Sequence, residues 1–409
     1  ESPYTVTGNI LVPTGVTLTI EAGVTVKFNS GLYIKIKGTI IAEGTSTSLI
    51  TFTSNQANPA NGDWKYIMFD NSNTVFDSEY NYQSGNKMKY CVISYAEYGL
   101  RIFQSSFYLD NSIISNNSLS GIDFDDVTKS LISNNTISNN PSGTSLTGLS
   151  NDEGDNNNSN DTYKDVMWLA NTIKDNDNSG LIFNRHGSRS YNNTYKNNII
   201  TGNGSGWGYG LDLPWGNVTD GVKNNLIEGN IIYNNDNGIR IGTGPVGWGG
   251  DYPTNVSTIK NNFIIKNNGF AINTYQTYTD QTLVIENNVI VSSQNTNRLV
   301  ELNDEKGSIF RFNVLINTGD SGGPLFSFSD AYQDENSKNN IVNHNTFIFR
   351  NRTGLELFYG GNTFENNNIS NLSNSSEFYS VKILGDDNND FENNYWGTTT
   401  ESEIQAAIY

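Results

Sequence analysis

A recurring block of short apolar stretches separated by asparagines and glycines is the feature that most constrains the fold of this chain. Residues 222–244, VKNNLIEGNIIYNNDNGIRIGTG, contain three such stretches, divided by Asn pairs and single glycines. Apolar alternation over a few residues, broken by Asn and Gly, predicts strands and turns and not helices. The block recurs, and the glycine that opens its third stretch stands at Gly99, Gly121, Gly143, Gly180, Gly210, Gly238 and Gly269.

These glycines follow one another at steps of 22 to 37 residues. A repeat of about 20–50 residues is typical of stacked architectures. Three short strands per repeat fit one coil of a parallel β-solenoid, in which each coil covers the open edge of the next. Asparagines stacked at the bends are expected to bond to each other along the solenoid and satisfy the polar groups of the turns. We therefore predict an all-β, single-domain solenoid over residues 1–409, with Asn-rich coils over 91–390.

Both ends of the chain depart from this pattern. Residues 1–53 alternate strictly between apolar and polar side chains and predict N-terminal capping coils. At the other end, the spacing of Thr400 and Glu403 is that of a helical capping box. A short C-terminal capping helix is expected over residues 400–409, with Ile404 and Ala407 on one face.

Composition limits the partners and the location of the protein. The 409 residues carry a net charge of −18, which argues against nucleic acid or an anionic membrane as the main partner. No apolar stretch of about 18 residues is present, so no membrane span is expected. The single cysteine, Cys91, lies in an apolar stretch and is expected in the core. A start at Glu1 without Met suggests processing, so we expect a secreted or cell-surface protein, and a monomer.

The NN-x-I and N-x-x-GI repeats, behind the segment VPTGVTLTIEAGVTVKF, resemble the right-handed parallel β-helix superfamily with the pectin-lyase-like fold. The resemblance covers most of the chain and implies a carbohydrate-active protein. Polysaccharide lyases and glycoside hydrolases dominate that superfamily, and adhesins and tailspikes form a minority. The Asn-rich coils and the ending NNYWGTTTESEI also resemble surface and secreted β-helix proteins of archaea and bacteria. Among these, the nearest named candidate is a methanogen disaggregatase, which depolymerises a chondroitin-like capsule.

Alignment of the glycines predicts which side chains of the third strands point outward, because side chains alternate along a strand. The outward column contains Arg101, Asp123, Ser145, Ile182, Asp212, Arg240, Ala271 and Glu301. A second column, two residues further on, contains Phe103, Asp125, Thr147, Asn184, Pro214, Gly242, Asn273 and Asn303. Asp212 is thus expected beside Arg240 on the next coil, while Asp123 and Asp125 are about 6.5–7 Å apart on one strand.

Long Gly-rich connections gather around Asp212 and bring aromatic and basic side chains to the same region. Aromatic side chains that would stack on sugar rings are Trp207, Tyr209, Trp215, Trp248, Tyr252 and Tyr275. Side chains that would orient an anionic substrate are Asn184, Arg185, His186, Arg189 and Arg240. Such a cationic patch on an acidic chain predicts a glycan that carries uronate or sulfate groups.

Two reactions fit these residues. Inverting glycoside hydrolysis needs carboxyl groups about 6.5–9.5 Å apart, which Asp123 and Asp125 satisfy, and Asp251 could approach Asp212 as a second pair. We favour an endo-acting glycoside hydrolase, with β-elimination by a polysaccharide lyase as the alternative, in which His186, an Arg or a Tyr is the base. No cofactor is expected to be required, although Ca²⁺ could assist.

Plainer interpretations stay open for each candidate. Asp123 and Asp125 could be solvated surface carboxylates, and Asp212 with Arg240 could be a structural pair. His186 could be incidental, and the tryptophans could pack under their own loops. The whole groove could serve binding alone, in a non-catalytic surface protein or adhesin.

Overall fold

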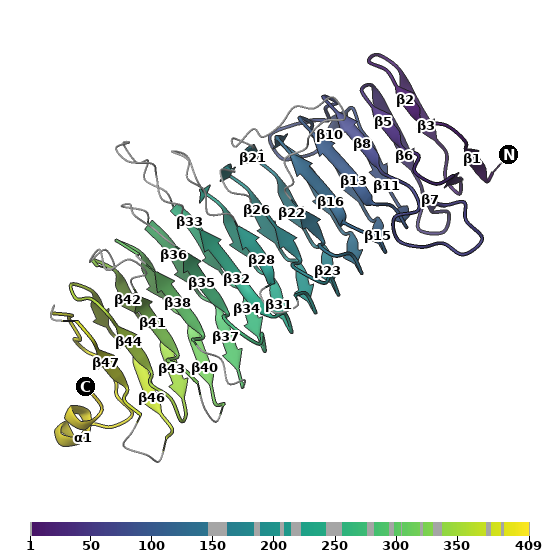
Figure 1. The fold of residues 1–409 in the computed structure, drawn as a ribbon. Helices are drawn as coiled ribbons and strands as arrows, with labels where there is room; N and C mark the ends of the chain where they lie inside the picture. The colour runs from purple at the N-terminus through teal and green to yellow at the C-terminus, as the bar shows by residue number, and fades with distance from the viewer. Residues whose placement is uncertain are drawn as a thin grey trace. The chain divides into compact units, whose positions relative to one another are not determined.

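The computed structural model describes residues 2–145, 162–183, 189–204, 208–213, 222–242, 256–275, 282–293, 298–303, 305–319, 322–329, 338–373, 378–385 and 388–408. The chain divides into two compact units, Glu1–Ser205 (unit 1) and Gly206–Tyr409 (unit 2). Within each unit short strands follow one another around successive coils and pair in parallel with the coils before and after (Figure 1). The expected parallel β-solenoid is confirmed, whereas its description as one domain stays a prediction.

Unit 1 contains three main sheets, which we call sheet 1, sheet 2 and sheet 3. Sheet 1 contains β3 (Thr17–Ile20), β6 (Thr39–Glu43), β11 (Lys87–Lys89), β14 (Tyr108–Asp110), β18 (Leu131–Ser133), β22 (Met167–Leu169) and β26 (Thr194–Lys196). Sheet 2 contains β1 (Tyr4–Val6), β4 (Thr25–Phe28), β7 (Ile50–Ser54), β12 (Cys91–Ser94), β15 (Ile113–Ser115), β19 (Thr136–Ser138), β23 (Thr172–Lys174) and β27 (Ile199–Thr201). Sheet 3 contains β2 (Ile10–Val12), β5 (Ile34–Ile36), β8 (Ile67–Asp70), β13 (Tyr98–Phe103), β16 (Ser120–Asp125) and β20 (Thr144–Ser145).

Further strands of unit 1 stand outside these three runs. A small sheet contains β17 (Val127–Thr128), β21 (Thr162–Lys164) and β25 (Arg189–Tyr191). The antiparallel hairpin of β9 (Val75–Phe76) and β10 (Tyr82–Ser84) interrupts the chain between β8 and β11. Beside β20 lies β24 (Leu181–Ile182), whose Ile182 amide donates to Thr144 Oγ1 at 3.0 Å.

Unit 2 repeats the three-sheet arrangement. Sheet 1 contains β30 (Leu226–Glu228), β33 (Val256–Lys260), β36 (Thr282–Glu286), β39 (Ile309–Arg311), β42 (Ile341–Asn343) and β45 (Thr363–Glu365). Sheet 2 contains β31 (Ile231–Tyr233), β34 (Phe263–Ile265), β37 (Val289–Ser292), β40 (Val314–Asn317), β43 (Thr346–Phe349) and β46 (Asn368–Asn371). Sheet 3 contains β28 (Tyr209–Leu213), β32 (Asn237–Gly242), β35 (Ile272–Tyr275), β38 (Val300–Asn303), β41 (Phe326–Ser329), β44 (Leu355–Leu357) and β47 (Val381–Ile383), and β29 (Val222–Lys223) precedes β30.

Asparagine pairs form the corners of the coils, as the sequence predicts. In Asn261-Asn262 the first residue adopts a left-handed conformation, with φ of 58°, which Asn tolerates better than most residues. The second is buried and donates from Nδ2 to Asn288 Oδ1 on the next coil, at 3.0 Å. Its backbone N–H donates to the same oxygen, also at 3.0 Å. Asn288 therefore accepts from both the backbone and the side chain of the ladder asparagine on the preceding coil.

The ladder of Asn262 and Asn288 continues along the solenoid. It extends over Asn230, Asn262, Asn288, Asn313, Asn345, Asn367 and Asn394 in unit 2. Unit 1 has equivalent rows, one of them over Asn117, Asn140, Asn176 and Asn203. The inward residues between these corners are apolar and buried, and they include Cys91 as predicted.

The C-terminal helix is present but is capped differently from the prediction. Helix α1 spans Glu401–Ala406, and Thr400 makes no side-chain capping bond, so the predicted capping box is wrong. The hydroxyl of Thr398 binds the Glu403 carboxylate instead. After the helix, Ile408 forms a bridge to Val381 of β47, so the chain end covers part of the last coil. In the part of the chain that the structure describes, no helix is long and apolar enough to cross a membrane.

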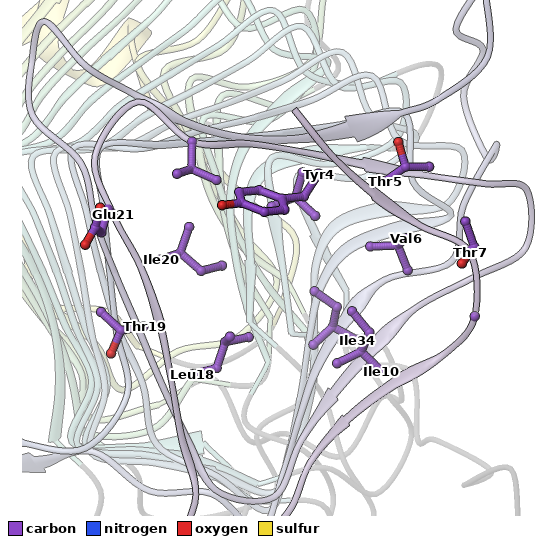
Figure 2. A pocket seen from close by; sticks show the side chains of 13 residues that line it. Tyr4, Thr5, Val6, Thr7, Ile10, Leu18, Thr19, Ile20, Glu21 and Ile34 are labelled. Atoms are coloured by element: carbon purple, nitrogen blue, oxygen red, sulfur yellow. The ribbon is translucent and has the colours of Figure 1, made fainter. Parts of the chain in front are cut away.

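The first coil of unit 1 leaves a cavity of about 670 Å³ at its N-terminal end. Figure 2 shows that apolar side chains from β1, β2 and β3 line this cavity, with Tyr4 between Ile20 and Val6. Residues 1–53 form regular strands of the three sheets, and their role as capping coils stays a prediction.

The outward face of sheet 3 differs from the outward faces of the other two sheets. Strands of sheets 1 and 2 alternate in burial, as in β30 and β31, where only the central residue is buried. In β8, β16, β28, β38 and β41 every residue is buried. Polar side chains on the outer side of these five strands are therefore shielded from water.

Candidate functional site

The register of sheet 3 in unit 2 aligns a column of polar side chains. Asp212 of β28 stands opposite Arg240 of β32, as the sequence predicts. The column continues through Asn273, Glu301, Ser327 and Glu356 on the following coils. Neighbouring strands lie about 4.8 Å apart, so the side chains of adjacent coils are within bonding distance.

Arg240 is held on two sides. Its Nε donates to Asp212 Oδ1 at 2.7 Å and its Nη2 donates to Asp212 Oδ2 at 2.6 Å. Its guanidinium carbon lies 4.6 Å from the centre of the Tyr209 ring, a cation–π contact. Asp212 is 2% exposed and the Arg240 side chain 23% exposed. The pair is bidentate and largely desolvated, which fixes the orientation of the arginine.

The environment of Tyr209 changes its acidity. Burial raises the pKa of the Tyr209 hydroxyl, the nearby Arg240 lowers it, and the carboxylates of Asp212 and Glu301 raise it, with a result of about 12. Tyr209 therefore keeps its proton at neutral pH. Its ring is buried against Arg240, so the predicted role as an exposed sugar-stacking platform is wrong.

A second charged group lies further along the same column. Asn273 Nδ2 donates to Glu301 Oε2 at 3.0 Å, and the Ser329 hydroxyl donates to Glu301 Oε1 at 3.1 Å. Arg298 binds Glu301 through Nη1 and Glu356 Oε1 through Nη2, the latter at 3.3 Å. One guanidinium thus joins two carboxylates that stand two coils apart.

The column predicted from glycines needs one correction. Ala271, expected to point outward, is buried and occupies the place opposite Gly238. Asn273 belongs to the column of Arg240 and not to the second column. The cause is that Gly269 lies in the turn before β35, so Ala271 takes the position that glycine occupies in other coils. A Cβ at Gly238 would approach the Ala271 carbonyl oxygen to 2.3 Å, which explains why the preceding coil needs glycine there.

In unit 1 the predicted carboxylates lie on the outer side of β16. Arg101 stands opposite Asp123, and its Nε donates to Asp123 Oδ2 at 3.1 Å. Asp123 is fully buried and Asp125 is buried as well. Their interpretation as solvated surface carboxylates is wrong, because both are shielded and Asp123 is paired.

The structure places only a few of the remaining predicted site residues. Arg189 begins β25, a strand of the small corner sheet and not of sheet 3, and Tyr275 ends β35 opposite Gly242. The following predicted residues lie outside the described residues: Asn184, Arg185, His186, Trp207, Trp215, Trp248, Asp251 and Tyr252. Among the residues that the structure does describe, no group of three or more His, Cys, Asp or Glu side chains could hold a metal ion.

Comparison with known proteins bears on the fold. A family model of a pectate-lyase-like β-helix domain matches residues 1–99, and a model of the right-handed β-helix region matches residues 79–217. The chain is a right-handed parallel β-helix. No curated protein sequence matches this β-helix, so the resemblance to disaggregatases stays a prediction.

Several solved structures are similar to this β-helix. The A-module of a mannuronan C-5 epimerase from Azotobacter vinelandii is 13% identical, with 88% of this chain and 91% of that chain covered and a TM-score of 0.43. A pectate lyase is 16% identical, with 73% and 70% covered and a TM-score of 0.38. A tailspike protein of the Escherichia coli bacteriophage HK620 is 11% identical, with 92% and 59% covered and a TM-score of 0.34. Such low identities do not carry an activity from one protein to another.

Several residues on the outer face of the β-helix were missed by the sequence prediction. In unit 2 these are Asn273, Arg298 and Glu356, together with Glu301, which was placed in the column but given no role. Alignment on the ladder asparagines would not have recovered this column, because Arg240 lies five residues after Asn235 whereas Asn273 lies six residues after Asn267.

Proposed function

We propose that this protein cleaves an acidic, uronate-containing polysaccharide on the outer face of sheet 3 in unit 2. The observation that supports this most directly is the fixed, partly exposed Arg240, held by both oxygens of a buried carboxylate and by the Tyr209 ring. Removal of paired charges from water is costly, and such arrangements concentrate at functional sites. The match to a pectate-lyase-like β-helix domain agrees with a carbohydrate-active role.

Arg240 is suited to bind a sugar carboxylate. An arginine presents N–H donors in a planar fork that matches a carboxylate, and Asp212 fixes this fork through Nε and Nη2. Its orientation is set before substrate arrives, which reduces the entropy lost on binding. A uronate carboxylate placed against the exposed edge of the guanidinium would be neutralised there.

The pairing bears on the choice between the two reactions. Both oxygens of Asp212 accept hydrogen bonds from Arg240, so this carboxylate orients the arginine and is poorly placed to donate a proton. Asp123 is buried as well, and its Oδ2 accepts from Arg101 Nε. These contacts favour β-elimination over hydrolysis by these two carboxylates.

β-Elimination would use the site as follows. Neutralisation of the uronate carboxylate by Arg240 acidifies the proton on C5, and a base removes it. The C4–O bond then breaks, a double bond forms between C4 and C5, and the departing oxygen takes a proton. Tyr209, protonated at neutral pH, is a candidate donor of that proton. His186, which lies outside the described residues, stays the proposed base.

Hydrolysis is the second candidate. It would use Asp212 with Asp251, or Asp123 with Asp125, as acid and base, and the burial of all three described carboxylates argues for a shielded site. Water would add across the glycosidic bond, and no unsaturated sugar would form. The products therefore separate the two reactions without reference to mechanism.

The test is incubation with polygalacturonate, alginate and chondroitin. Release of reducing ends together with ultraviolet absorbance from an unsaturated sugar would establish elimination, and reducing ends alone would establish hydrolysis. Arg240→Gln is expected to reduce the rate by about 100-fold or more, as for loss of one charge-stabilising donor. Arg311→Gln, on sheet 1 of the same unit, is the matched control and should leave the rate unchanged.

The same assay tests the remaining expectations. Binding of one of these polymers without any product would indicate a glycan-binding surface protein or adhesin and would refute the enzymatic proposal. We propose that no cofactor is required, so dialysis against EDTA should leave the rate unchanged, and recovery on addition of Ca²⁺ would show that this is wrong. A polymeric substrate also fits the proposed location outside the cell, and we propose that the protein acts there as a monomer.

A further inference from the structure

Unit 1 contains an arrangement on sheet 3 that parallels the Asp212, Arg240 and Tyr209 group of unit 2. Arg101 of β13 pairs with Asp123 on the next coil, and its guanidinium carbon lies 4.6 Å from the centre of the Tyr98 ring. In both units an arginine is thus fixed by a buried aspartate from a neighbouring coil and by a tyrosine face. The same arrangement of arginine, aspartate and tyrosine therefore occurs on the outer face of sheet 3 in both units.

Aromatic stacking extends this arrangement over several coils. The guanidinium carbon of Arg101 also lies 5.2 Å from the Tyr66 ring centre. The Tyr66 ring stacks on that of Tyr33 with centres 5.2 Å apart and planes 23° apart. Met68 and Phe103 pack against the same rings. Arg101 therefore sits in a rigid stack, in which a single orientation is favoured.

Further cations line the same face. The register of β5, β8 and β13 places Lys35, Met68 and Arg101 in one outward column on successive coils. Both Lys35 and Lys37 bind Asp70, at 3.1 and 3.5 Å. The side chains of Arg101, Lys35 and Lys37 are 14%, 21% and 45% exposed, so the three cations reach solvent from shielded anchors.

The anchoring carboxylate of the lysines is ionised over a wide pH range. Burial raises the pKa of Asp70, but hydrogen bonds from Asn71 and Lys35 and the charges of Lys35 and Lys37 outweigh it, so the pKa lies below its ordinary value. Lys35 and Arg101 stand two coils apart, about 10 Å at the usual strand spacing. The face therefore carries Lys35 and Arg101 at fixed positions, each held by a buried carboxylate.

We infer that Lys35, Lys37, Arg101 and Tyr98 form a separate binding subsite for a carboxylated sugar chain. The lysines and the arginine would bind carboxylates, and the outer face of Tyr98 would contact a sugar ring. The inference rests on the proposed function for the identity of the ligand, a uronate-containing glycan. Its role is to hold the polymer, and none of these residues takes part in bond cleavage.

The experiment uses the full chain carrying Arg240→Gln, which removes the arginine of the unit 2 site. Binding of oligogalacturonate and of an uncharged oligosaccharide of equal length is measured by titration calorimetry. Of the two ligands, only the charged one is expected to bind. Its Kd should rise about tenfold or more in Arg101→Gln and about threefold in Lys37→Gln. Lys37 is the most exposed of the three cations, so its replacement tests the subsite without a risk to folding.

Lys174→Gln is the matched control, because Lys174 lies on sheet 2 of the same unit with its side chain 44% exposed. An unchanged Kd in the control and a raised Kd in both test variants would support the subsite. Equal binding of the uncharged oligosaccharide, or an unchanged Kd in both Arg101→Gln and Lys37→Gln, would overturn it. If the parent cleaves no uronate polymer and Arg101→Gln still weakens the binding of oligogalacturonate, the enzymatic proposal is refuted and the subsite is supported. If the parent cleaves such polymers and neither Arg101→Gln nor Lys37→Gln changes the Kd, the enzymatic proposal is supported and the subsite is refuted.

Discussion

Sheet 1 and sheet 3 of unit 2 both carry ion pairs between neighbouring coils, yet they place them in different surroundings. On sheet 1, Lys260 and Glu228 lie 3.6 Å apart with both side chains partly exposed. On sheet 3, Asp212 is buried and bound by two nitrogens of Arg240. The coil repeat places both pairs in the same way, so the difference lies in what shields each face. Desolvation, and not the repeat itself, distinguishes the candidate site from the plain scaffold.

The largest expected effect is loss of one partner from the shielded pair. Arg240→Ala leaves the Asp212 carboxylate buried without its cation, and the free energy of unfolding should fall by about 3–5 kcal/mol. Chemical unfolding curves of the parent and the variant measure this difference. The double variant Asp212→Asn with Arg240→Gln should recover much of the loss, because no buried charge remains. A loss below about 1 kcal/mol in Arg240→Ala would show that the pair is solvated like those on sheet 1.

The asparagine ladder is expected to be nearly as sensitive. Asn313→Ala removes bonds to Asn345 and to the Ile285 carbonyl and leaves the N–H groups of Asn288 without their acceptor. A loss of about 3 kcal/mol is expected, since unsatisfied buried groups cost about 1–3 kcal/mol each.

Asn268 supplies the matched control for the ladder. Its side chain is exposed, and its Nδ2 donates to Asp236 Oδ1 at a longer distance of 3.3 Å. Asn268→Ala should change the free energy of unfolding by less than about 0.5 kcal/mol. Equal losses in the two alanine variants would show that the ladder contributes no more than a surface asparagine.

Glu305, buried at the corner between β38 and β39, should make the stability of unit 2 depend on pH. Burial raises the pKa of its carboxyl from 4.5 to about 7, against the lowering effect of hydrogen bonds from Ser308 and Thr274. The native state then holds the proton more tightly than the unfolded state. The stabilisation is complete below about pH 4.5 and is lost as the pH rises through about 7, by about 3 kcal/mol in total.

The variant Glu305→Gln isolates this contribution. Unfolding midpoints measured between about pH 4 and pH 8 should decline with rising pH in the parent and less steeply in the variant. Parallel curves would mean that the Glu305 carboxyl is ionised in the folded state at all these pH values.

The smallest effect is expected on the exposed face of sheet 1. Glu228→Gln removes the partner of Lys260 and should alter the free energy of unfolding by less than about 1 kcal/mol, because solvent screens the pair. The effect should shrink further when salt is added. A larger loss than in Arg240→Ala would reverse the order that burial predicts.

Much of this architecture could be predicted from the sequence because it depends on local patterns. In pairs such as Asn261-Asn262 the first residue adopts the left-handed turn and the second joins the ladder, so the pairs mark the corners of coils. The position of Asp212 beside Arg240 could be predicted from the same repeat. The error in the predicted column after Gly269 could not be avoided, because a glycine in a turn cannot be told in sequence from a glycine that begins a strand.

The stack of Tyr33, Tyr66 and Arg101 was beyond prediction for another reason. Between β8 and β13 the chain inserts the hairpin of β9 and β10, so the coil length there departs from that of its neighbours. Register across such an insertion depends on how the whole coil closes. Shielding of sheet 3 is likewise a property of the folded chain, and the alternation of residues in β16 or β28 does not reveal it.

The most direct test of the account is the initial rate of depolymerisation of a uronate polymer by three proteins: the parent, Arg240→Gln and Arg311→Gln. The sheet 1 variant should equal the parent, and the sheet 3 variant should be slower by about 100-fold or more. Equal rates in all three proteins, with normal folding of each, would contradict it.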